Sequence, residues 1–462
     1  MRDRRGLAGG LLASLLTLAA AIALRRFVVD DAWIPARYAE HLAGGLGYRF
    51  NAGGAVTDGV TPLPWAPWLA VWVRLGAPAL LVARATSLLG MLTAAWLVGR
   101  AVALRDGGFV RFAPLLVFGS APVGAWAVGG LETGAVVALV AAGVTAARAT
   151  VSTSALGLAA ALRPECLPMV VVLAVARPGT HAARGARGLA AAAPFAAVVG
   201  ARLACFGSPV PLSVLAKPAD LSHGWPYVAA GLLLLGAPAF AVAPRALTSP
   251  SQREARWQLA SVIVHAGAVA WAGGDWMPLS RLLLPALPPL VLAGAALASD
   301  APPWLGAARA AVCAGALAFA WATGGRASMA DIAGTREALI ELARGPLRDR
   351  RSVAALDVGW VSAATRERVV DLAGLTDPAI AALPGGHTSK QIPAAFLDDR
   401  GVDSLVLLRR RGCGRGCVRG DGGPFERAVE ARLAEDPWVA ERFVVGATVS
   451  AGPLTYVVLT RR

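Results

Sequence analysis

The chain has 462 residues, of which 56% are hydrophobic and 16% charged, and its mean hydropathy is +0.57. Apolar segments of about twenty residues, the length needed to cross a hydrocarbon core, recur along it, so the composition excludes an ordinary soluble domain and indicates a polytopic membrane protein. The net charge of +15 does not indicate nucleic-acid binding, because the basic residues collect in short loops and no basic face with interleaved aromatic residues is visible.

The first apolar segment, residues 6–24, follows the basic sequence MRDRR. It is longer than the core of a usual secretory signal and many apolar segments follow it, so we expect an uncleaved first helix and a cytoplasmic N-terminus. Hydrophobic patterning predicts further apolar segments at about residues 62–78, 80–99, 112–128, 133–148, 154–176, 187–204, 227–243, 257–273, 280–298 and 304–322.

Arginine-rich loops indicate which ends of these segments face the cytoplasm. Arginines cluster at residues 100–111, 177–187 and 245–256, and the positive-inside rule places all three loops in the cytoplasm. With the N-terminus also inside, one segment before residue 100 and the segment near residue 160 cannot be simple crossings.

Two of the apolar segments have sequences that disfavour a simple membrane crossing. The first half of 62–78 is rich in proline and tryptophan, which favours a helix lying at the membrane interface. The sequence Arg163-Pro164-Glu165 interrupts the segment 154–176, and we expect two short half-spans that meet outside at this point.

With these exceptions the unusual polar motifs all face outward. They are Asp30-Asp31, the sequence GLET at 130–133, Arg163-Pro164-Glu165, the stretch 206–217 that ends at Lys217, and GGD at 273–275. Beyond about residue 325 the long apolar runs cease, and stretches such as SVAALDVGW and SLVLL predict a compact α/β domain. We therefore expect a membrane core at residues 1–325 and an extracytoplasmic α/β domain at residues 326–462.

The run DDAWIPARYAEHLAGGLGYRFNAGGAVTDGVTPLPW resembles the first external loop of bacterial C-type (GT-C) glycosyltransferases, especially the mycobacterial terminal arabinofuranosyltransferases and related membrane transferases. Later motifs match in the same order: GLETG, LRPE, FGSPVPLSVLAK, GGDWMPLSRLLLPALP, DVGW and DLAGLTDPAI. The resemblance covers residues 28 to 380. The chain departs from it at DGVTP, residues 58–62, where relatives often read EGYTN, and at Ile34-Pro35, so the superfamily is better supported than the donor sugar.

The resemblance implies a fold and an activity. The fold is an all-α membrane core of about ten to eleven apolar helices with a juxtamembrane helical first external loop, followed by a small α/β domain. The activity is inverting transfer of a sugar from a polyprenyl-phosphate donor to a cell-envelope glycan, lipid or protein on the outer face of the cytoplasmic membrane.

Asp30 and Asp31 are the candidate catalytic residues. Such a transferase must remove a proton from an acceptor hydroxyl, and two adjacent carboxylates repel one another, which raises the pKa of one toward the working pH. By resemblance Asp30 is the expected base, with Asp31 orienting it or the acceptor. The structural alternative is that Asp30 caps the helix that begins at this point.

Positive charge is needed where the phosphate leaves, and the candidates are Lys217, Arg163 and Arg281. Lys217 is the strongest of these candidates for binding the phosphate, because its ammonium would lie just above the bilayer at headgroup depth. Arg163 has the alternative of pairing with Glu165, and Arg281 of snorkelling to the interface.

Further acidic and aromatic residues are candidates for binding the sugar or the acceptor. They are Glu132, Glu165, Asp275, Trp276 and Asp58. Glu132 has the alternative of a charge placed at a helix N-terminus, and Asp275 of a loop cap. A divalent cation held by Asp30 and Glu132 is conceivable, but no dedicated cage is visible and metal dependence stays open.

Cys413 and Cys417 lie in the expected outer domain and could form a local disulfide or remain thiols.

Two other classes of function stay open. One is a transporter or lipid flippase, which the lack of an internal repeat disfavours. The other is an inactive relative that serves as an envelope scaffold, which the presence of both Asp30 and Asp31 disfavours.

Overall fold

The computed structural model describes residues 2–105, 109–217, 220–235, 252–299, 302–410 and 425–462. The chain forms two compact units. The helical unit contains Met1–Phe27, Leu81–Ala201 and Ala219–Ser328, and the loop–sheet unit contains Val28–Leu80, Arg202–Pro218 and Met329–Arg462. The expected first external loop therefore belongs to the same unit as the C-terminal sheet.

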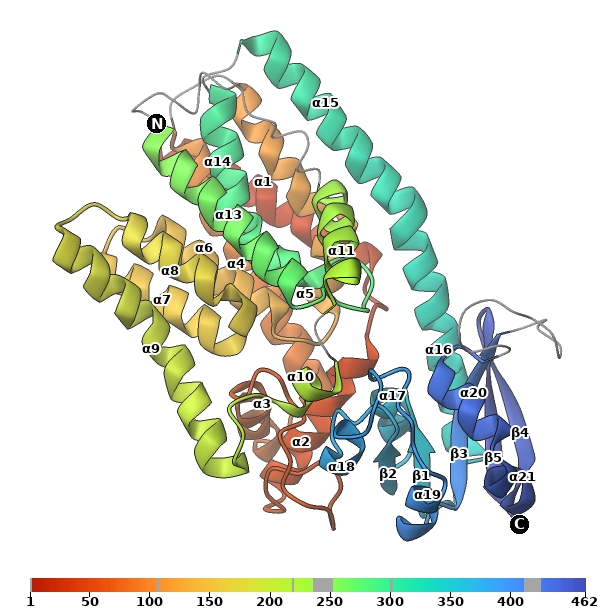
Figure 1. The fold of residues 1–462 in the computed structure, drawn as a ribbon. Coiled ribbons are helices and arrows are strands. Elements are labelled where there is room, and N and C mark those ends of the chain that lie inside the picture. Colours follow the sequence, from red (N-terminus) through yellow and green to blue (C-terminus); the bar gives the residue numbers. More distant parts are fainter. Residues whose placement is uncertain (1, 106–108, 218–219, 236–251, 300–301, 411–424) are drawn as a thin grey trace. The chain divides into compact units, whose positions relative to one another are not determined.

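Among the described residues, the helical unit consists of α-helices and short helices of other types (Figure 1). Its helices are α1 (Arg2–Ala23), α4 (Ala79–Ala103), η2 (Phe109–Gly119), α5 (Ala121–Val128), α6 (Thr133–Thr145), α7 (Ala149–Leu162), η3 (Pro164–Cys166), α8 (Leu167–Ala176), α9 (His181–Phe206), α11 (Leu221–Leu234), α13 (Arg253–Trp271), η6 (Arg281–Ala286), α14 (Leu287–Ser299), α15 (Pro303–Ala320) and η7 (Trp321–Gly325). Helices α4 and α9 each extend by a few residues into the loop–sheet unit.

Five stretches of helix are long and apolar enough to cross a membrane, within the part of the chain that the structure describes. They are Arg4–Ala23, Ala79–Ala103, His181–Phe206, Arg281–Ala298 and Pro303–Gly325, and Arg111–Gly119 with Ala121–Val128 makes a sixth if this pair, bent by 49°, is one span. These helices indicate a membrane protein.

Several expected crossings are short or broken. Within 62–78 the structure has α3 (Trp65–Arg74), whose ten residues reach only about 15 Å. Within 154–176, α7 ends at Leu162, Arg163 is extended, and α8 begins after η3. Proline at residue 164 removes an amide donor and disfavours helical geometry in the residue before it, which explains why the helix stops there.

Small residues bring helices of this unit into close contact. A Cβ built on Gly9 would lie 2.4 Å from the carbonyl oxygen of Gly99, and one on Gly134 would lie 1.9 Å from that of Ser87. Helix α4 therefore packs tightly against both α1 and α6. Such contacts are typical of helix pairs in membranes, where close backbone approach contributes more than apolar burial does.

The loop–sheet unit is built around a five-stranded sheet of order β2-β1-β3-β5-β4. Its strands are β1 (Ser352–Ala355), β2 (Arg368–Asp371), β3 (Ser404–Arg410), β4 (Phe443–Ala451) and β5 (Leu454–Arg461). Strand β1 pairs in parallel with β2 and β3, while β5 pairs antiparallel with β3 and β4. The buried apolar residues of β1 and β3 suit central strands covered on both faces.

Helices of the unit come from all three of its chain segments. They are η1 (Asp30–Ala32), α2 (Trp33–Ala43), α3, α10 (Leu212–Ala216), α16 (Arg326–Arg344), α17 (Val358–Ala364), α18 (Pro378–Ala381), α19 (Ala395–Asp399), α20 (Ala428–Glu435) and α21 (Pro437–Arg442). Helix α17 follows β1 along the chain and packs against β2 (Figure 1). Ile34, Tyr38, Phe50 and Val60 of the loop share one hydrophobic core with the sheet.

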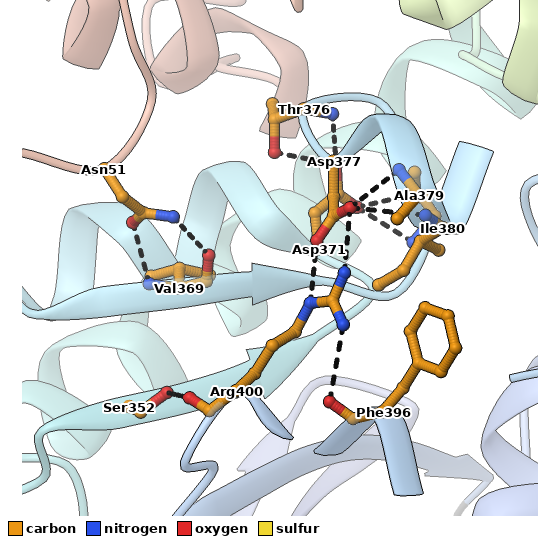
Figure 2. A network of polar contacts seen from close by, with 12 residues as sticks. Asn51, Ser352, Val369, Asp371, Thr376, Asp377, Ala379, Ile380, Phe396 and Arg400 are labelled. Carbon is orange, nitrogen blue, oxygen red and sulfur yellow. Dashed lines mark hydrogen bonds and ion pairs between the residues drawn. The ribbon is translucent and has the colours of Figure 1, made fainter. Parts of the chain in front are cut away.

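Polar contacts fasten the loop to the sheet. The Arg37 guanidinium is buried and donates to the carbonyl oxygens of Phe50 at 2.8 Å, Thr365 at 3.2 Å and Glu367 at 2.6 Å. The Asn51 amide accepts from the backbone N–H of Val369 at 2.9 Å and donates to its carbonyl at 2.8 Å (Figure 2). Because β2 is an edge strand, Asn51 takes the place of a neighbouring strand at this position.

The segment after β2 is organised by two aspartates (Figure 2). The buried Asp371 carboxylate accepts hydrogen bonds from the backbone N–H groups of Ala373, Gly374 and Thr376 and from the Thr376 hydroxyl. Asp377 caps α18 and pairs with Arg400 at 3.0 Å. The sequence DLAGLTDPAI therefore has a structural role at the end of β2.

Candidate functional site

The Asp30 carboxylate lies at the start of helix α17. Its Oδ2 accepts from the backbone N–H of Gly359 at 3.2 Å and its Oδ1 from that of Trp360 at 2.5 Å. These residues are 329 and 330 positions away along the chain, so the motifs DDA and DVGW meet in space. Asp30 does not cap its own helix, since η1 has Val29 and α2 has Ala32 at the N-cap position, neither with a side-chain cap bond.

Gly359 permits this contact because it has no side chain. A Cβ at this position would lie 2.0 Å from the carbonyl oxygen of Asp30 and 3.0 Å from its Cγ. Nearby, the indole rings of Trp33 and Trp360 lie 6.4 Å apart. The backbone of the loop thus rests directly on the first turn of α17.

Asp357 occupies the N-cap position of α17 but makes no side-chain cap bond. Its Oδ2 instead accepts from the Tyr456 hydroxyl at 3.1 Å, and its Oδ1 pairs with Nη2 of Arg427 at 2.8 Å. Arg427 also lies 3.2 Å from Glu430, whose buried carboxylate accepts from the N–H of Leu408. Asp357 is thereby held away from α17 by residues of β5 and of the segment before α20.

The surroundings of Asp30 favour its protonated form. Burial raises the pKa of Asp30 well above its ordinary value of 3.8, and the negative charges of Asp357 and Asp31 raise it further. The amides of Trp360 and Gly359 act in the opposite direction and lower the pKa, because they stabilise the carboxylate. Asp30 as a whole residue is neither fully buried nor fully exposed.

Asp58 and Lys217 belong to the same unit. Asp58 is buried and pairs with Nε of Arg202 at 2.7 Å, and its carbonyl oxygen accepts from the N–H of Leu212, the first residue of α10. The Asp58 carboxylate is therefore occupied by a guanidinium. Lys217 follows α10 and is half-buried, and no ion pair of its ammonium is seen with any residue that the structure describes.

The helical unit brings three other motifs together. The Glu132 carboxylate, at the start of α6, pairs with Nε of Arg163, and both side chains are buried. Arg163 also lies 3.4 Å from Glu165 and interacts electrostatically with Asp275. GLETG, LRPE and GGDWMPLSR thus contribute to one cluster of charged side chains.

Asp275 and Arg281 form the other part of this cluster, with Nε of Arg281 lying 2.5 Å from Asp275 and its guanidinium 5.6 Å from the ring centre of Trp126. Leu279 and Ser280, just before Arg281, have φ of 63° and 49°. Left-handed backbone at two successive non-glycine residues costs free energy, and such strain concentrates at functional sites.

Two further residues support the cluster from α13 and α11. The buried His265 ring lies 3.2 Å from the carbonyl oxygen of Glu165 and 2.7 Å from that of Leu282. Trp276 is exposed and stacks on His223, with ring centres 4.5 Å apart and planes 11° from parallel. Trp276 therefore presents one aromatic face outward.

The predicted site residues fall into two groups. Asp30, Asp31, Asp58 and Lys217 lie in the loop–sheet unit, and Glu132, Arg163, Glu165, Asp275, Trp276 and Arg281 lie in the helical unit. Arg163 pairs with Glu165, which was the structural alternative to a phosphate-binding role, and it also pairs with Glu132. Arg281 does not snorkel to a surface, since its side chain is 10% exposed and pairs with Asp275.

The described part of the chain contains no group of three or more His, Cys, Asp or Glu residues that could hold a metal ion. Both Asp30 oxygens accept backbone N–H groups, and Glu132 pairs with Arg163 in the other unit. The expected disulfide between Cys413 and Cys417 lies outside the described residues.

The sequence alone did not predict a role at these sites for four residues, namely Asp357, Arg427, Tyr456 and Arg202. Arg202 carried a usable signal, because it is a charge near the end of an apolar segment and such residues are costly unless they have a partner. Asp357 stood in the DVGW motif without an assigned role. Arg427 and Tyr456 carried no local signal, since their contacts depend on the folded sheet.

Comparison with known proteins adds one match. A domain of unknown function (DUF8728) matches residues 330–451, which lie within the loop–sheet unit. No curated protein and no solved structure matches the chain.

Proposed function

We propose that the protein is an inverting glycosyltransferase of the GT-C type, which moves a sugar from a polyprenyl-phosphate donor to a cell-envelope acceptor. The observation that carries the proposal is the Asp30 carboxylate, which lies next to Asp31 at the first amides of α17 and whose pKa is raised by burial and by two like charges. The candidate spans support a bilayer as the source of a lipid-linked donor. The motif resemblance supports the choice of reaction.

In this mechanism Asp30 removes the proton of an acceptor hydroxyl as that oxygen attacks the anomeric carbon. The bond to the phosphate breaks on the opposite face of the sugar, so the configuration is inverted. A carboxylate with a raised pKa is a stronger base than an ordinary one. Asp31 orients Asp30 or the acceptor.

Lys217 is the proposed partner of the departing phosphate. Its half-buried ammonium follows α10 in the same unit as Asp30. Arg163 and Arg281 are weaker candidates, because carboxylates outnumber guanidiniums in the cluster of Glu132, Arg163, Glu165, Asp275 and Arg281. Excess negative charge disfavours a phosphate there and suits hydrogen bonds to sugar hydroxyls.

The cluster with the outward face of Trp276 is the proposed sugar- or acceptor-binding region. Asp58 fits this role less well, because Arg202 already occupies its carboxylate in a buried pair.

The proposed topology has ten to eleven apolar helices, an N-terminus in the cytoplasm, and the α/β domain on the outer face of the cytoplasmic membrane. In that topology α3 lies at the interface, with Trp68 and Trp72 exposed.

The test reconstitutes the purified full-length protein in liposomes with a panel of polyprenyl-phosphate sugars and measures donor consumption by mass spectrometry. We expect consumption of one donor by the wild type and a loss of 100-fold or more in Asp30→Asn, the upper range for removing a general base being about 10⁴-fold. Asp377→Asn is the matched control, because Asp377 is an aspartate of the same unit that caps α18.

Unchanged transfer by Asp30→Asn would overturn the role of Asp30. If the wild type consumes no donor, but lipid-linked sugar crosses the bilayer in a protein-dependent way, the flippase alternative replaces the transferase.

A further inference from the structure

Helix α17 is unusual in how its first amides are satisfied. The unit's other helices that begin after an aspartate are capped by that residue: Asp377 accepts from Ala379 and Ile380, and Asp436 accepts from Trp438. Asp357 stands at the same position before α17 and makes no such bond. The amides of Gly359 and Trp360, which an N-cap aspartate would accept from, donate to Asp30 instead.

Pairing with an arginine does not by itself prevent capping. Asp377 pairs with Arg400 at 3.0 Å and still caps α18. Asp357 differs because it has two partners away from the helix, Nη2 of Arg427 at 2.8 Å and the Tyr456 hydroxyl at 3.1 Å. These partners come from the segment before α20 and from β5, so the folded sheet determines where the Asp357 carboxylate points.

Titratable groups of η1, of the start of α17 and of β5 interact electrostatically with Asp30. Asp31 comes from η1 itself and Asp357 from the start of α17, and both are negative when ionised. Tyr456 of β5 interacts electrostatically with Asp30 and is held by Asp357. Arg427 is the positive partner of Asp357, and it is shared between Asp357 and Glu430.

We propose that Asp357 is a positioning residue for Asp30. Arg427 and Tyr456 hold its carboxylate away from α17, which leaves the first amides of that helix to Asp30, and its negative charge lies beside Asp30. This inference rests on the proposed function in so far as Asp30 is the base.

The test measures protonation of Asp30 directly and does not require activity. Dicyclohexylcarbodiimide reacts with protonated carboxyl groups, so peptide mass spectrometry of the labelled full-length protein gives the pH at which half of Asp30 is modified. In Asp357→Asn we expect this midpoint to fall by roughly one pH unit, because a like charge is removed from beside Asp30. Asp357→Ser provides a second neutral N-cap residue if the asparagine variant does not fold.

Asp377→Asn is the matched control, since it neutralises an N-cap aspartate paired with an arginine in the same unit. We expect its Asp30 midpoint to equal that of the wild type. A wild-type midpoint in the folded Asp357 variants overturns the inference, and so does an equal fall in Asp377→Asn.

Activity then separates the two proposals. If the protein transfers sugar, the acidic limb of its pH–rate profile moves with the labelling midpoint in the Asp357 variants, whereas a merely structural role would lower the rate without moving the limb. If the midpoint moves but the wild type transfers no sugar, the proposed function fails and the positioning role stands.

Discussion

The proposed base Asp30 can act only in its ionised form, and its neighbours influence the pH at which that form prevails. Burial, Asp357 and Asp31 all raise its pKa above the ordinary value of 3.8, and the two amides of α17 offset part of this rise. The carboxyl group therefore stays protonated at pH values where an ordinary aspartate is already ionised.

We expect the rate of sugar transfer to fall on acidification at a pH well above 4. The measurement is kcat/KM between pH 5 and 9 in liposomes, with one proton governing the acidic limb. An acidic limb at the position of an unperturbed carboxyl group would contradict the role assigned to the surroundings of Asp30.

Arg163 is the residue on which the charged cluster of the helical unit depends. It pairs with Glu132, whose side chain is 1% exposed. Arg163→Met leaves that carboxylate buried without its partner, so we expect a loss of about 3–5 kcal/mol in stability. The double variant Glu132→Gln with Arg163→Met should recover much of this loss, because no charge of the pair remains.

The measurement is thermal unfolding in detergent micelles. Arg105→Met is the control, because Arg105 pairs with a Glu254 side chain that is 61% exposed and such pairs contribute at most about 1 kcal/mol. Equal losses in the Arg163 and Arg105 variants would show that burial of the pair has no energetic consequence.

At the scale of elements, the contact between η1 and α17 depends on a missing side chain. Helix propensity favours alanine over glycine by about 1 kcal/mol, so Gly359→Ala would stabilise α17 if nothing lay against it. The added Cβ would lie 2.0 Å from the Asp30 carbonyl oxygen, so we expect the opposite: a lower melting temperature and a loss of transfer.

Gly53→Ala is the matched control, because Gly53 lies in the same loop segment and a Cβ there meets nothing within 4 Å. It should melt at the wild-type temperature or slightly above it. A Gly359→Ala variant that behaves like Gly53→Ala would show that η1 does not rest on α17 in solution.

Local signals predicted the elements well where the residues themselves impose a structure. Pro164, beside two charged residues, predicted the break between α7 and α8, and the apolar runs predicted the long helices. The partners of the site residues could not be predicted in this way. Asp30 and Trp360 are 330 residues apart, and Asp58 and Arg202 are 144 residues apart, so their contacts depend on the tertiary fold and not on the neighbouring sequence.

At the scale of the whole molecule, the C-terminal sheet shares its core with the loop. The loop contributes Ile34, Tyr38, Phe50 and Val60 to its core, together with the Arg37 contacts to the segment after α17. The match to a domain of unknown function covers residues 330–451 and includes none of these side chains.

We expect residues 329–462 expressed alone to expose apolar surface, bind a hydrophobic dye and self-associate. A single chain that carries residues 28–80 joined to 329–462 by a flexible linker should melt at a higher temperature and bind less dye. A monomeric fragment that melts at the temperature of the joined chain would contradict the shared core.

Because the loop–sheet unit is assembled from distant segments, its parts are synthesised at different times. Tyr38 and Phe50 leave the ribosome early, whereas β5, which lies between β3 and β4 in the sheet, is made last. Until then the loop has no sheet to cover its aromatic side chains, and a nascent chain in that state is prone to aggregate. Quality-control factors that shield this loop during translation would therefore determine how much protein matures.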